Sequence, residues 1–326
     1  MKNKVVALGE LLIDFTPIGL SEKGHPQYEQ NAGGAPANVA VAVSKLGGAS
    51  SVISAVGEDF FADFLEKTLQ DHQVDTVALQ RIPSATTTLA FVSLNERGDR
   101  SFCFARKPGA DMLLCKDSIP SSFADDCGIF HFGSISLGAE KSKEATLWAA
   151  ESAKKKGALI SYDPNWREAL WPDREEGIEA MKLGLSLSQI VKLSEEELEL
   201  LSSFKDEKEG TDWLFSMYPD IQLIVVTLGP KGCFYRTKSL HGFLPTYDVK
   251  VVDTTGSGDS FWGCLLHSIV NDSSLLENND RAVLEKALYK ANAAGAICAS
   301  ARGAIGAIPT EKDIQQTLSE GKLLFL

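Results

Sequence analysis

Asp259 follows a glycine turn, Gly256-Ser257-Gly258, in a pattern that could do chemistry. The turn lies between an alternating segment at 246–252, which we expect to form a strand, and an apolar segment at 260–270, which we expect to form a helix. The backbone N–H groups of the turn would then lie at a helix N-terminus and could bind an anion. A carboxylate is unfavourable there unless it has a task, such as accepting a proton from an attacking hydroxyl. The alternative is that Asp259 is a first-turn acid that only stabilises the helix.

A second glycine-rich stretch occurs near the N-terminus, at Gly33-Gly34-Ala35-Pro36-Ala37-Asn38. The paired glycines allow the backbone to approach a ligand closely, and Pro36 suits the first turn of a helix. We expect that helix at 37–46, ending at two further glycines. Close helix packing would explain the alanines. It does not explain Gly33, Gly34 and Asn38, which we therefore take as candidate ligand-binding residues.

The elements that must position these residues alternate along the chain. An apolar run at 4–9 and further runs at 129–132, 159–163, 190–193 and 223–228 read as strands, with a helix predicted at 140–156 and another at 280–301. Alternation of this kind predicts a parallel sheet with helices on both faces, and ligands bind beyond the carboxyl ends of such strands. Asp14 has an alternative interpretation, namely that it is simply an acid on the protein surface. The residues that we place at this edge are Asp14, Asn165, Arg167, Glu197, Thr227, Gly229 and Asp259.

A smaller unit interrupts this alternation. Segments 86–94 and 101–106 read as two strands joined by a hairpin at 95–100. With residues 12–32 they would form a small antiparallel sheet, and a sheet inserted in this way commonly serves as a lid. The edges of such a lid invite pairing between chains, so we expect a homodimer.

Composition excludes some partners. The chain of 326 residues carries 32 Lys and Arg against 44 Asp and Glu, a net charge of −12, which argues against nucleic acid or a membrane surface as a partner. No apolar run approaches the length of a membrane span. The six scattered cysteines contain no Cys-x-x-Cys and suit free thiols in a reducing compartment, so we expect a cytosolic protein.

Several catalytic motifs are absent from the sequence. There is no Walker A sequence, no Gly-x-Gly-x-x-Gly after the first strand, no Gly-x-Ser-x-Gly and no histidine pair at metal-ligand spacing. The chemistry that remains closest is phosphoryl transfer to a small polyol, with Asp259 as the base and the glycine turn as the anion hole.

Two of these stretches resemble the signatures of the ribokinase-like, PfkB-type carbohydrate kinases. Residues 33–40 resemble the first signature and residues 253–261 the second, in the same order, and the likeness extends over essentially the whole chain. Within that family, the stretches at 8–14, 106–111, 133–135 and 162–167 look like fructokinases.

The resemblance implies a fold, a reaction and a set of site residues. The fold would be a single three-layer α/β/α domain, 1–326, with a mostly parallel central sheet and a β lid built from about 12–32 and 86–107. The reaction would convert D-fructose to fructose 6-phosphate with ATP and Mg²⁺, with Asp259 as the base. Gly256, Ser257 and Gly258 would hold the charge of the transferring phosphoryl group. The implied substrate-binding residues are Asp14, Gly33, Gly34, Asn38 and Arg106 at the sugar and Arg167 near the phosphates. The implied nucleotide-binding residues are Ser194, Thr227, Gly229, Gly232 and Asn292.

The resemblance also implies two cation sites. Glu197 would orient a water on Mg²⁺. A potassium ion beside the anion hole would be held by Asp253, Thr255 and the carbonyls of Cys298, Ala301 and Gly303. Two departures bear on these sites. Ser194 stands where the family's Asn-x-x-Glu motif has the longer asparagine, and Ala307 stands where a serine ligand is common.

Other functions stay open at this level. Ribokinase and 2-keto-3-deoxygluconate kinase share the mechanism, and the lid with Arg106 should discriminate between them. The apolar lid of a nucleoside kinase is not evident. A function of a different class is that of a non-catalytic paralogue that binds a sugar or nucleotide. Loss of Asp259 or of the glycine turn would favour this class, but both are intact.

Overall fold

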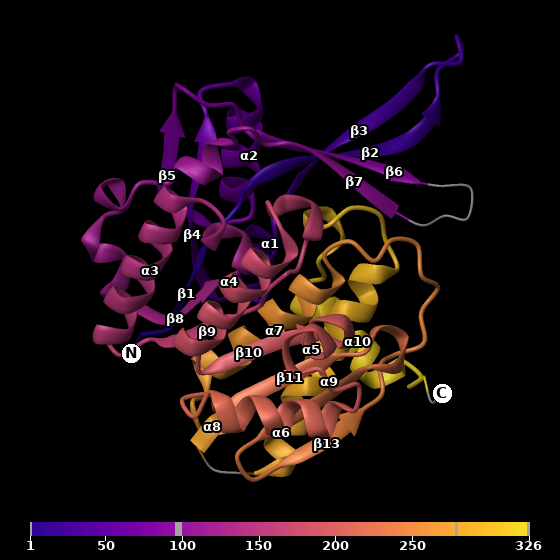
Figure 1. The fold of residues 1–326 in the computed structure, drawn as a ribbon. Coiled ribbons are helices and arrows are strands. Elements are labelled where there is room, and N and C mark those ends of the chain that lie inside the picture. The colour runs from indigo at the N-terminus through magenta and orange to yellow at the C-terminus, as the bar shows by residue number, and fades with distance from the viewer. Residues whose placement is uncertain (1, 95–99, 278–279, 325–326) are drawn as a thin grey trace.

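The fold, taken from a computed structural model that describes residues 2–94, 100–277 and 280–324, has three layers around a large sheet (Figure 1). Among the described residues this sheet has nine strands in the order β13-β12-β11-β10-β9-β8-β1-β4-β5. All pairings are parallel except those of β12 with β11 and β13. The strands are β1 Lys4–Leu8, β4 Ala49–Gly57, β5 Asp75–Ile82, β8 Cys127–Phe132, β9 Leu159–Tyr162, β10 Ile190–Ser194, β11 Leu223–Thr227, β12 Cys233–Thr237 and β13 His241–Leu244.

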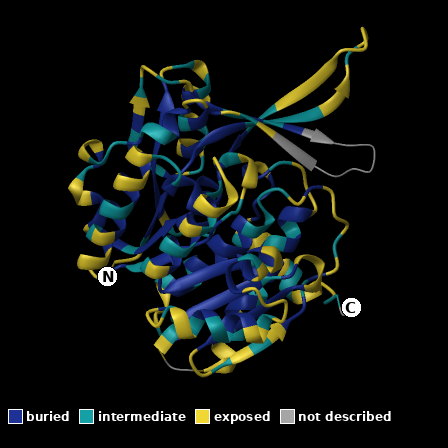
Figure 2. Cartoon of the chain, in the orientation of Figure 1, coloured by how far each residue is buried: buried dark blue, intermediate teal, exposed yellow. Residues whose placement is uncertain are grey.

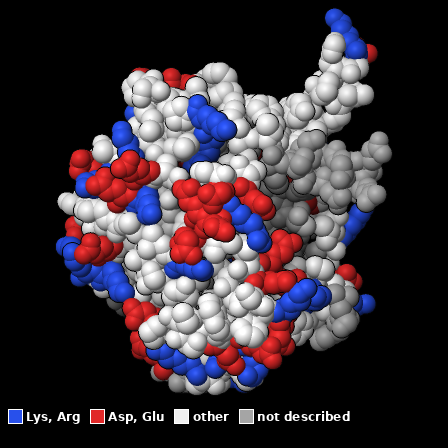
Figure 3. Space-filling model, in the orientation of Figure 1, with Lys and Arg blue, Asp and Glu red and all other residues white. Residues whose placement is uncertain are grey.

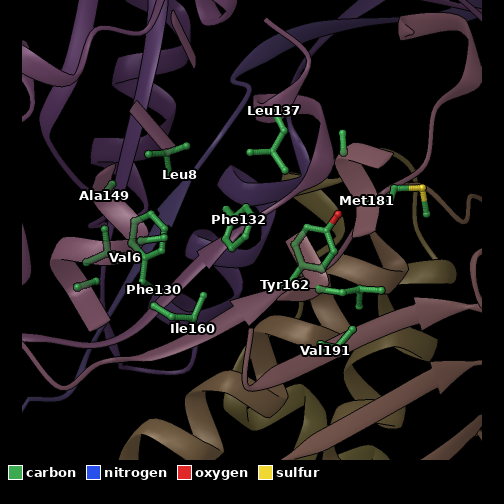
Figure 4. Close-up of a cluster of buried hydrophobic side chains, with 14 of the residues drawn as sticks. Val6, Leu8, Phe130, Phe132, Leu137, Ala149, Ile160, Tyr162, Met181 and Val191 are labelled. Carbon is green, nitrogen blue, oxygen red and sulfur yellow. The ribbon is translucent and has the colours of Figure 1, made fainter. Parts of the chain in front are cut away.

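Both faces of the sheet are buried, because alternate side chains of each strand enter different cores. In β1, Val6 and Leu8 pack into the core under α3 to α6, whereas Val5 and Ala7 face the opposite layer. Figure 4 shows the first core, in which the rings of Phe132 and Tyr162 lie 4.9 Å apart. The central strands of the sheet are accordingly dark in Figure 2, whereas the edge strands β5 and β13 also carry exposed residues.

The helices divide between the two faces. One layer contains α3 Glu140–Lys155, α4 Arg174–Leu187, α5 Glu195–Ser202 and α6 Glu207–Met217. The other contains α1 Ala35–Lys45, α2 Phe60–Asp71, α7 Ser257–Asn271 and α9 Arg281–Ala299, and α8 Ser274–Glu277 and α10 Glu311–Glu320 pack beside α9. None of the helices in the described residues combines the length and apolarity that a membrane crossing requires.

Small residues bring α1 and α9 close to α7. A Cβ atom added to Gly263 of α7 would lie 2.6 Å from the Cβ of Ala42, and one added to Gly295 of α9 would lie 3.2 Å from the carbonyl of Ser257. The beginning of α7, which carries Asp259, is therefore held between two neighbouring helices.

A four-stranded sheet projects from the body (Figure 1). Its strands are β2 Leu12–Leu20, β3 Pro26–Gly33, β6 Thr88–Leu94 and β7 Arg100–Ala105, in the order β3-β2-β6-β7. Two pairings are antiparallel, as expected, and the central pairing of β2 with β6 is parallel. The turn at 95–99 lies outside the described residues. At the base of the sheet, Phe15 stacks on Phe91 at 5.0 Å and meets the edge of Phe61 of α2 at 5.9 Å.

Two expectations from the sequence are wrong. Residues 246–252 form no strand of the sheet; Tyr247 makes one isolated bridge to Leu323, and Asp248 N–H donates to the Lys322 carbonyl. The backbone of residues 246–248 therefore pairs with residues 322–324, and the Val252 N–H donates to the Ala299 carbonyl. Asp14 does not end a strand of the large sheet but lies in β2 of the projecting sheet. The chain leaves the large sheet at Gly9, whose φ of 157° and tight contact with Pro36 suit only glycine.

Candidate active site

Two cavities meet at the glycine turn, because Thr254 and Gly258 line both of them. The first, of about 360 Å³, lies between the projecting sheet and the carboxyl edge of the large sheet. The second, of about 410 Å³, lies between α7, α9 and the loop after β13. The first is lined by Glu10, Leu12, Asp14, Gly34, Ala35, Asn38, Phe104, Arg106, Ile135, Asn165, Arg167, Leu170, Lys192, Thr254, Thr255, Gly256, Gly258 and Asp259. The second is lined by Thr227, Gly229, Pro230, Gly232, Thr246, Tyr247, Val249, Val251, Thr254, Ser257, Gly258, Phe261, Asn292, Gly295, Ala296, Ala299 and Leu324.

Asp259 lies in the first turn of α7 and is buried. The amide Nδ2 of Asn38, which is on the first turn of α1, donates a hydrogen bond of 2.8 Å to its Oδ2. Burial raises the pKa of Asp259 to about 6, and the charge of Asp163 adds to this rise. The Asn38 hydrogen bond and the cations of Lys192 and Arg167 oppose it. Asp259 is therefore ionised at neutral pH and can accept a proton.

The glycine turn presents the N-terminus of α7 to both cavities. Gly256 precedes the helix with φ of 76°, and a Cβ there would lie 2.8 Å from the Cβ of Ala304. No side chain caps this helix end in the described part of the chain. Apart from the Ser257 N–H, which donates to the Thr254 carbonyl at 3.2 Å, the first N–H groups of α7 are thus suited to bind an anion where the two cavities adjoin.

A buried ion pair stands beside the turn. Lys192 Nζ contacts Asp163 Oδ2 at 2.6 Å, and only 7% and 1% of the two side chains is exposed. A Cβ on Gly258 would lie 3.3 Å from the same Nζ. The surrounding carboxylates raise the pKa of Lys192 in spite of its burial, so the ammonium stays charged. Sequence analysis missed both residues as site residues. The available signal was a lysine inside the apolar strand β10, because a buried lysine needs a partner.

Asp14 and Gly34 form part of the wall of the first cavity, and Gly33 lies behind the Asp14 carboxylate. A Cβ on Gly33 would lie 2.2 Å from Asp14 Oδ2, and one on Gly34 would lie 2.3 Å from the carbonyl of Glu10. Gly34 also has φ of 115°. The glycines therefore make room for the Asp14 carboxylate and for the start of α1. Burial raises the pKa of Asp14 to about 6, and the charge of Arg167 opposes the rise.

The two predicted arginines differ in how they are held. Arg106 is buried and forms an ion pair with Asp111 at 2.6 Å. Arg167 is exposed, and its guanidinium donates to the carbonyl of Trp166 at 2.8 Å. Both line the first cavity, as does Asn165, whose φ is 51°.

Ser194 and Glu197 form a capping box at the start of α5. The Ser194 hydroxyl accepts the Glu197 N–H, and the buried Glu197 carboxylate accepts the N–H groups of Ser194 at 2.8 Å and Trp166 at 2.7 Å. Neither residue lines either cavity. Glu197 fixes the loop that carries Arg167, and burial together with Asp163 raises its pKa.

The second cavity collects the other predicted nucleotide residues: Thr227, Gly229, Gly232 and Asn292. Asn292 Nδ2 donates to the carbonyl of Pro245 at 3.2 Å and so holds the loop after β13. Gly232 has φ of 111°, and a Cβ there would lie 2.1 Å from the Leu244 carbonyl. The apolar residues of the wall were not predicted: Tyr247, Val249, Val251 and Leu324.

The residues predicted to hold potassium come together in part. The Asp253 carboxylate accepts the N–H groups of Thr255 at 2.8 Å and Gly303 at 3.2 Å. These three residues, with Asp14, line a small cavity of about 10 Å³, about the space of one water-sized particle. Cys298 Sγ lies 3.7 Å from the Thr255 carbonyl. Cys298 and Ala301 do not line this cavity. Among the described residues, no three or more His, Cys, Asp or Glu side chains form a candidate metal cluster.

Two adjoining cavities with an anion-binding helix end and a buried carboxylate between them define a class, the small-molecule phosphotransferases. The match to the pfkB family carbohydrate kinases extends over residues 2–311, and the chain belongs to this family. The chain is 44% identical over 318 residues to fructokinase-1 of Zea mays. The aligned residues cover 97% of this chain and 98% of the relative.

Solved structures agree with this assignment and with a ribokinase-like fold. The crystal structure of a fructokinase from Xylella fastidiosa with bound ATP superimposes with a TM-score of 0.91 at 34% identity, covering 98% of this chain and 99% of the other. A fructokinase from Vibrio cholerae O395, in a form with fructose, ADP and calcium ion bound, has a TM-score of 0.86 at 35% identity, covering 96% of this chain and 98% of the other.

Proposed function

We propose that this chain is an ATP-dependent fructokinase, which transfers the γ-phosphoryl group of ATP to D-fructose and gives fructose 6-phosphate. The observation that carries the proposal is the position of Asp259 and the glycine turn at the junction of a polar and an apolar cavity. The identity to plant fructokinases and the likeness to solved fructokinases with fructose, ADP or ATP bound support it.

Asp259 would act as the general base. Asn38 engages its Oδ2, which orients the carboxylate and leaves the other oxygen to accept the proton of the sugar hydroxyl. General-base catalysis contributes about 10²–10⁴-fold. The backbone N–H groups of Gly256, Ser257 and Gly258 would stabilise the charge on the transferring phosphoryl group, which is commonly the largest contribution in phosphoryl transfer.

The Lys192–Asp163 pair would set the charge at this point. Lys192 lies next to Gly258 and opposes the rise in the pKa of both Asp259 and Glu197. It therefore favours the ionised form of the base, and its ammonium adds a positive charge beside the anion hole.

The other site residues divide between the two cavities. Asp14, Gly33, Gly34, Asn38 and Arg106 would bind the sugar, and Arg167 would lie near the phosphates. Thr227, Gly229, Gly232 and Asn292 would bind the nucleotide, and Ser194 would act through the helix cap. This division is supported by the cavity that each residue lines, by the close contact with Asp14 for Gly33, and by the capping box for Ser194.

Mg²⁺ would accompany ATP, held through water by Asp163 beside Glu197, whose two carboxylate oxygens already accept the N–H groups of Trp166 and Ser194. Asp163 Oδ1 is buried without a hydrogen-bond partner among the described residues, and carboxylate oxygens suit this hard cation. When bound, Mg²⁺ neutralises part of the phosphate charge. Potassium would be held by Asp253, Thr255 and the carbonyls of Cys298, Ala301 and Gly303. Ala307 offers no hydroxyl to such a site.

The remaining features concern assembly and compartment. The four-stranded sheet would act as a lid within a single kinase domain, and it would exclude water from the sugar. Ile18, Leu20 and Tyr28 on its first two strands are 50%, 68% and 45% exposed, which supports a homodimer formed through the lid. Acidic and basic side chains are interspersed on the face in Figure 3, and all six cysteines are free, which supports a cytosolic enzyme with small-molecule partners.

The test is ADP release with Mg-ATP and potassium against fructose, ribose, 2-keto-3-deoxygluconate, adenosine and no acceptor. We expect strong turnover on fructose and almost none without a sugar. Turnover on another acceptor would keep the mechanism and replace the substrate. Silence with folded protein would contradict the assignment.

A further inference from the structure

Arg106 is held by an acid that sequence analysis did not single out. Its Nε and Nη2 donate to Asp111 Oδ2 at 2.8 and 2.6 Å. The Thr88 hydroxyl donates to the other oxygen, Oδ1, at 2.5 Å. All three residues are buried, with 8%, 6% and 1% of their surfaces exposed. Because both carboxylate oxygens are engaged, Asp111 can adopt few other orientations.

This arrangement bears on the first cavity, which we call the sugar cavity because we propose that it binds the sugar, as we call the second the nucleotide cavity. Arg106 lines that cavity, whereas Asp111 and Thr88 do not. Asp111 engages one edge of the guanidinium fork, and the fork has further N–H donors for a ligand. A long, flexible side chain loses much entropy when it is ordered, so an arginine fixed before the sugar arrives binds it more tightly.

The cluster also lies where the projecting sheet joins the body. Thr88 begins β6, and Arg106 directly follows β7, with Asp111 in the short 3-10 helix Ala110–Leu113. Ala110 N–H donates to the Thr86 carbonyl at 2.9 Å. A Cβ on Gly109 would lie 2.0 Å from the Thr88 hydroxyl oxygen, so these segments pack too closely to move independently.

Glu10 connects the other two strands to the same place. It lies between β1 and β2, lines the sugar cavity, and its Oε1 accepts the N–H of Ala35, just after β3, at 3.0 Å. Burial raises the pKa of Glu10 to about 7; the charge of Asp111 adds to the rise and that of Arg106 opposes it. The charges of Glu10, Asp111 and Arg106, which lie where the strands of the projecting sheet join the body, therefore influence one another.

We propose that Asp111, fixed by Thr88, is a positioning residue that aims the Arg106 guanidinium at the acceptor sugar and fixes the lid strands around it. This inference rests on the proposed sugar-kinase function. It assigns Asp111 a role that acts through Arg106, so the two residues should not contribute independently.

The test is a double-mutant cycle in the full chain with D111N, R106Q and the double variant. We expect D111N to raise the KM for fructose and to lower kcat/KM by about 10–100-fold, the loss expected for a misplaced binding group. The KM for ATP should change less than about twofold, since the second cavity is untouched. D111N added to R106Q should cost little more than R106Q alone, because the effect of Asp111 requires Arg106.

Two further variants make the experiment decisive. T88V removes only the hydroxyl and should raise the KM for fructose by a smaller factor, even if D111N folds poorly. D212N is the matched control, because it breaks the Asp212–Arg236 pair (2.8 Å) between α6 and β12, away from the cavity, and should leave the KM for fructose unchanged. Equal, additive losses from D111N and R106Q, or a changed KM for ATP alone, would overturn the proposal.

Hydrogen–deuterium exchange without ligand separates this inference from the proposed function. D111N and T88V should increase exchange at residues 12–16 and 88–92, and D212N should not. If the variants show this pattern relative to the wild type, but the wild type fails to phosphorylate fructose, then the substrate assignment fails and the positioning role stands. Unchanged exchange in both D111N and T88V would refute the positioning role even in an active fructokinase.

Discussion

The first cavity, which we propose binds the sugar, and the second, which we propose binds the nucleotide, share the glycine turn but differ in the chemistry of their walls. Charged and amide side chains from many elements converge on the sugar cavity, among them Asp14, Asn38, Arg106, Lys192 and Asp259. Glycine backbone and apolar side chains make most of the wall of the nucleotide cavity. A small polyol has hydroxyl groups to satisfy and little apolar surface, whereas an adenine ring has an apolar face to bury.

The difference predicts that only the sugar cavity depends strongly on charge. Buried charges must be paired, and each raises or lowers the pKa of its neighbours, so the sugar cavity should be sensitive to pH and to the loss of any one charge. The nucleotide cavity should instead be sensitive to shape, because backbone conformation determines its wall. The following substitutions test this contrast, from the largest expected effect to the smallest.

Asp259→Asn should have the largest effect. The change keeps the size of the side chain but removes the base, so kcat should fall by about 10²–10⁴-fold. Calorimetry should show that fructose and ATP still bind, since the cavities remain. Turnover within a few-fold of wild type would remove Asp259 as the base.

Lys192→Met tests whether charge controls the sugar side. The groups that interact with Asp259 are Asp163, Lys192, Arg167, Asn38, Asp14 and Cys298. An acid with a raised pKa is ionised only above that value, so kcat/KM for fructose in the wild type should fall as the pH drops through about 6. Without the Lys192 cation this acid limb should move to higher pH, because less opposes the protonation of Asp259.

The same variant has a stability cost that must be measured beside its activity. Removing one partner of a buried ion pair destabilises a protein by about 3–5 kcal/mol. Lys4→Met is the matched control. Lys4 pairs with Asp75 at 3.1 Å and is the first residue of β1, so it lies at the edge of the large sheet opposite to the carboxyl ends of the strands. An unchanged acid limb in folded Lys192→Met protein would contradict the electrostatic role.

Asp14→Ala should separate the two cavities. A hydrogen bond to a charged group contributes about 1.5–3 kcal/mol, so the KM for fructose should rise by about 10–150-fold. The KM for ATP should change little in steady-state kinetics. If the KM for fructose stays the same, the sugar binds elsewhere.

Two glycines of the nucleotide cavity provide a matched pair for shape. Gly232→Ala introduces a Cβ 2.1 Å from the Leu244 carbonyl at φ of 111°, whereas Gly229→Ala introduces one into open space at φ of 55°. The first should raise the KM for ATP by about tenfold, a loss of ~1.4 kcal/mol, and the second by less. Neither should change the KM for fructose. An equal effect of both would show that steric fit does not control this cavity.

The sequence by itself determined much of the fold and predicted the centre of the candidate site. Apolar runs predicted β1, β8, β9, β10 and β11 within a residue or two, because strands buried on both faces need mostly apolar residues. Asp259, its glycine turn and Gly33, Gly34 and Asn38 could be proposed because glycine permits, and proline fixes, backbone geometry that is recognisable from the local sequence.

Tertiary structure decided the partners and the walls. The predicted strand at 246–252 proved to be a loop, because its backbone groups pair with residues 322–324, more than seventy positions away along the chain. Lys192 meets Asp163, and Arg106 meets Asp111 and Thr88, only after strands and loops are assembled. Local sequence patterns report the conformation of neighbouring residues. The pairing of a buried charge depends on which distant segment packs against it, and that is decided by the fold as a whole.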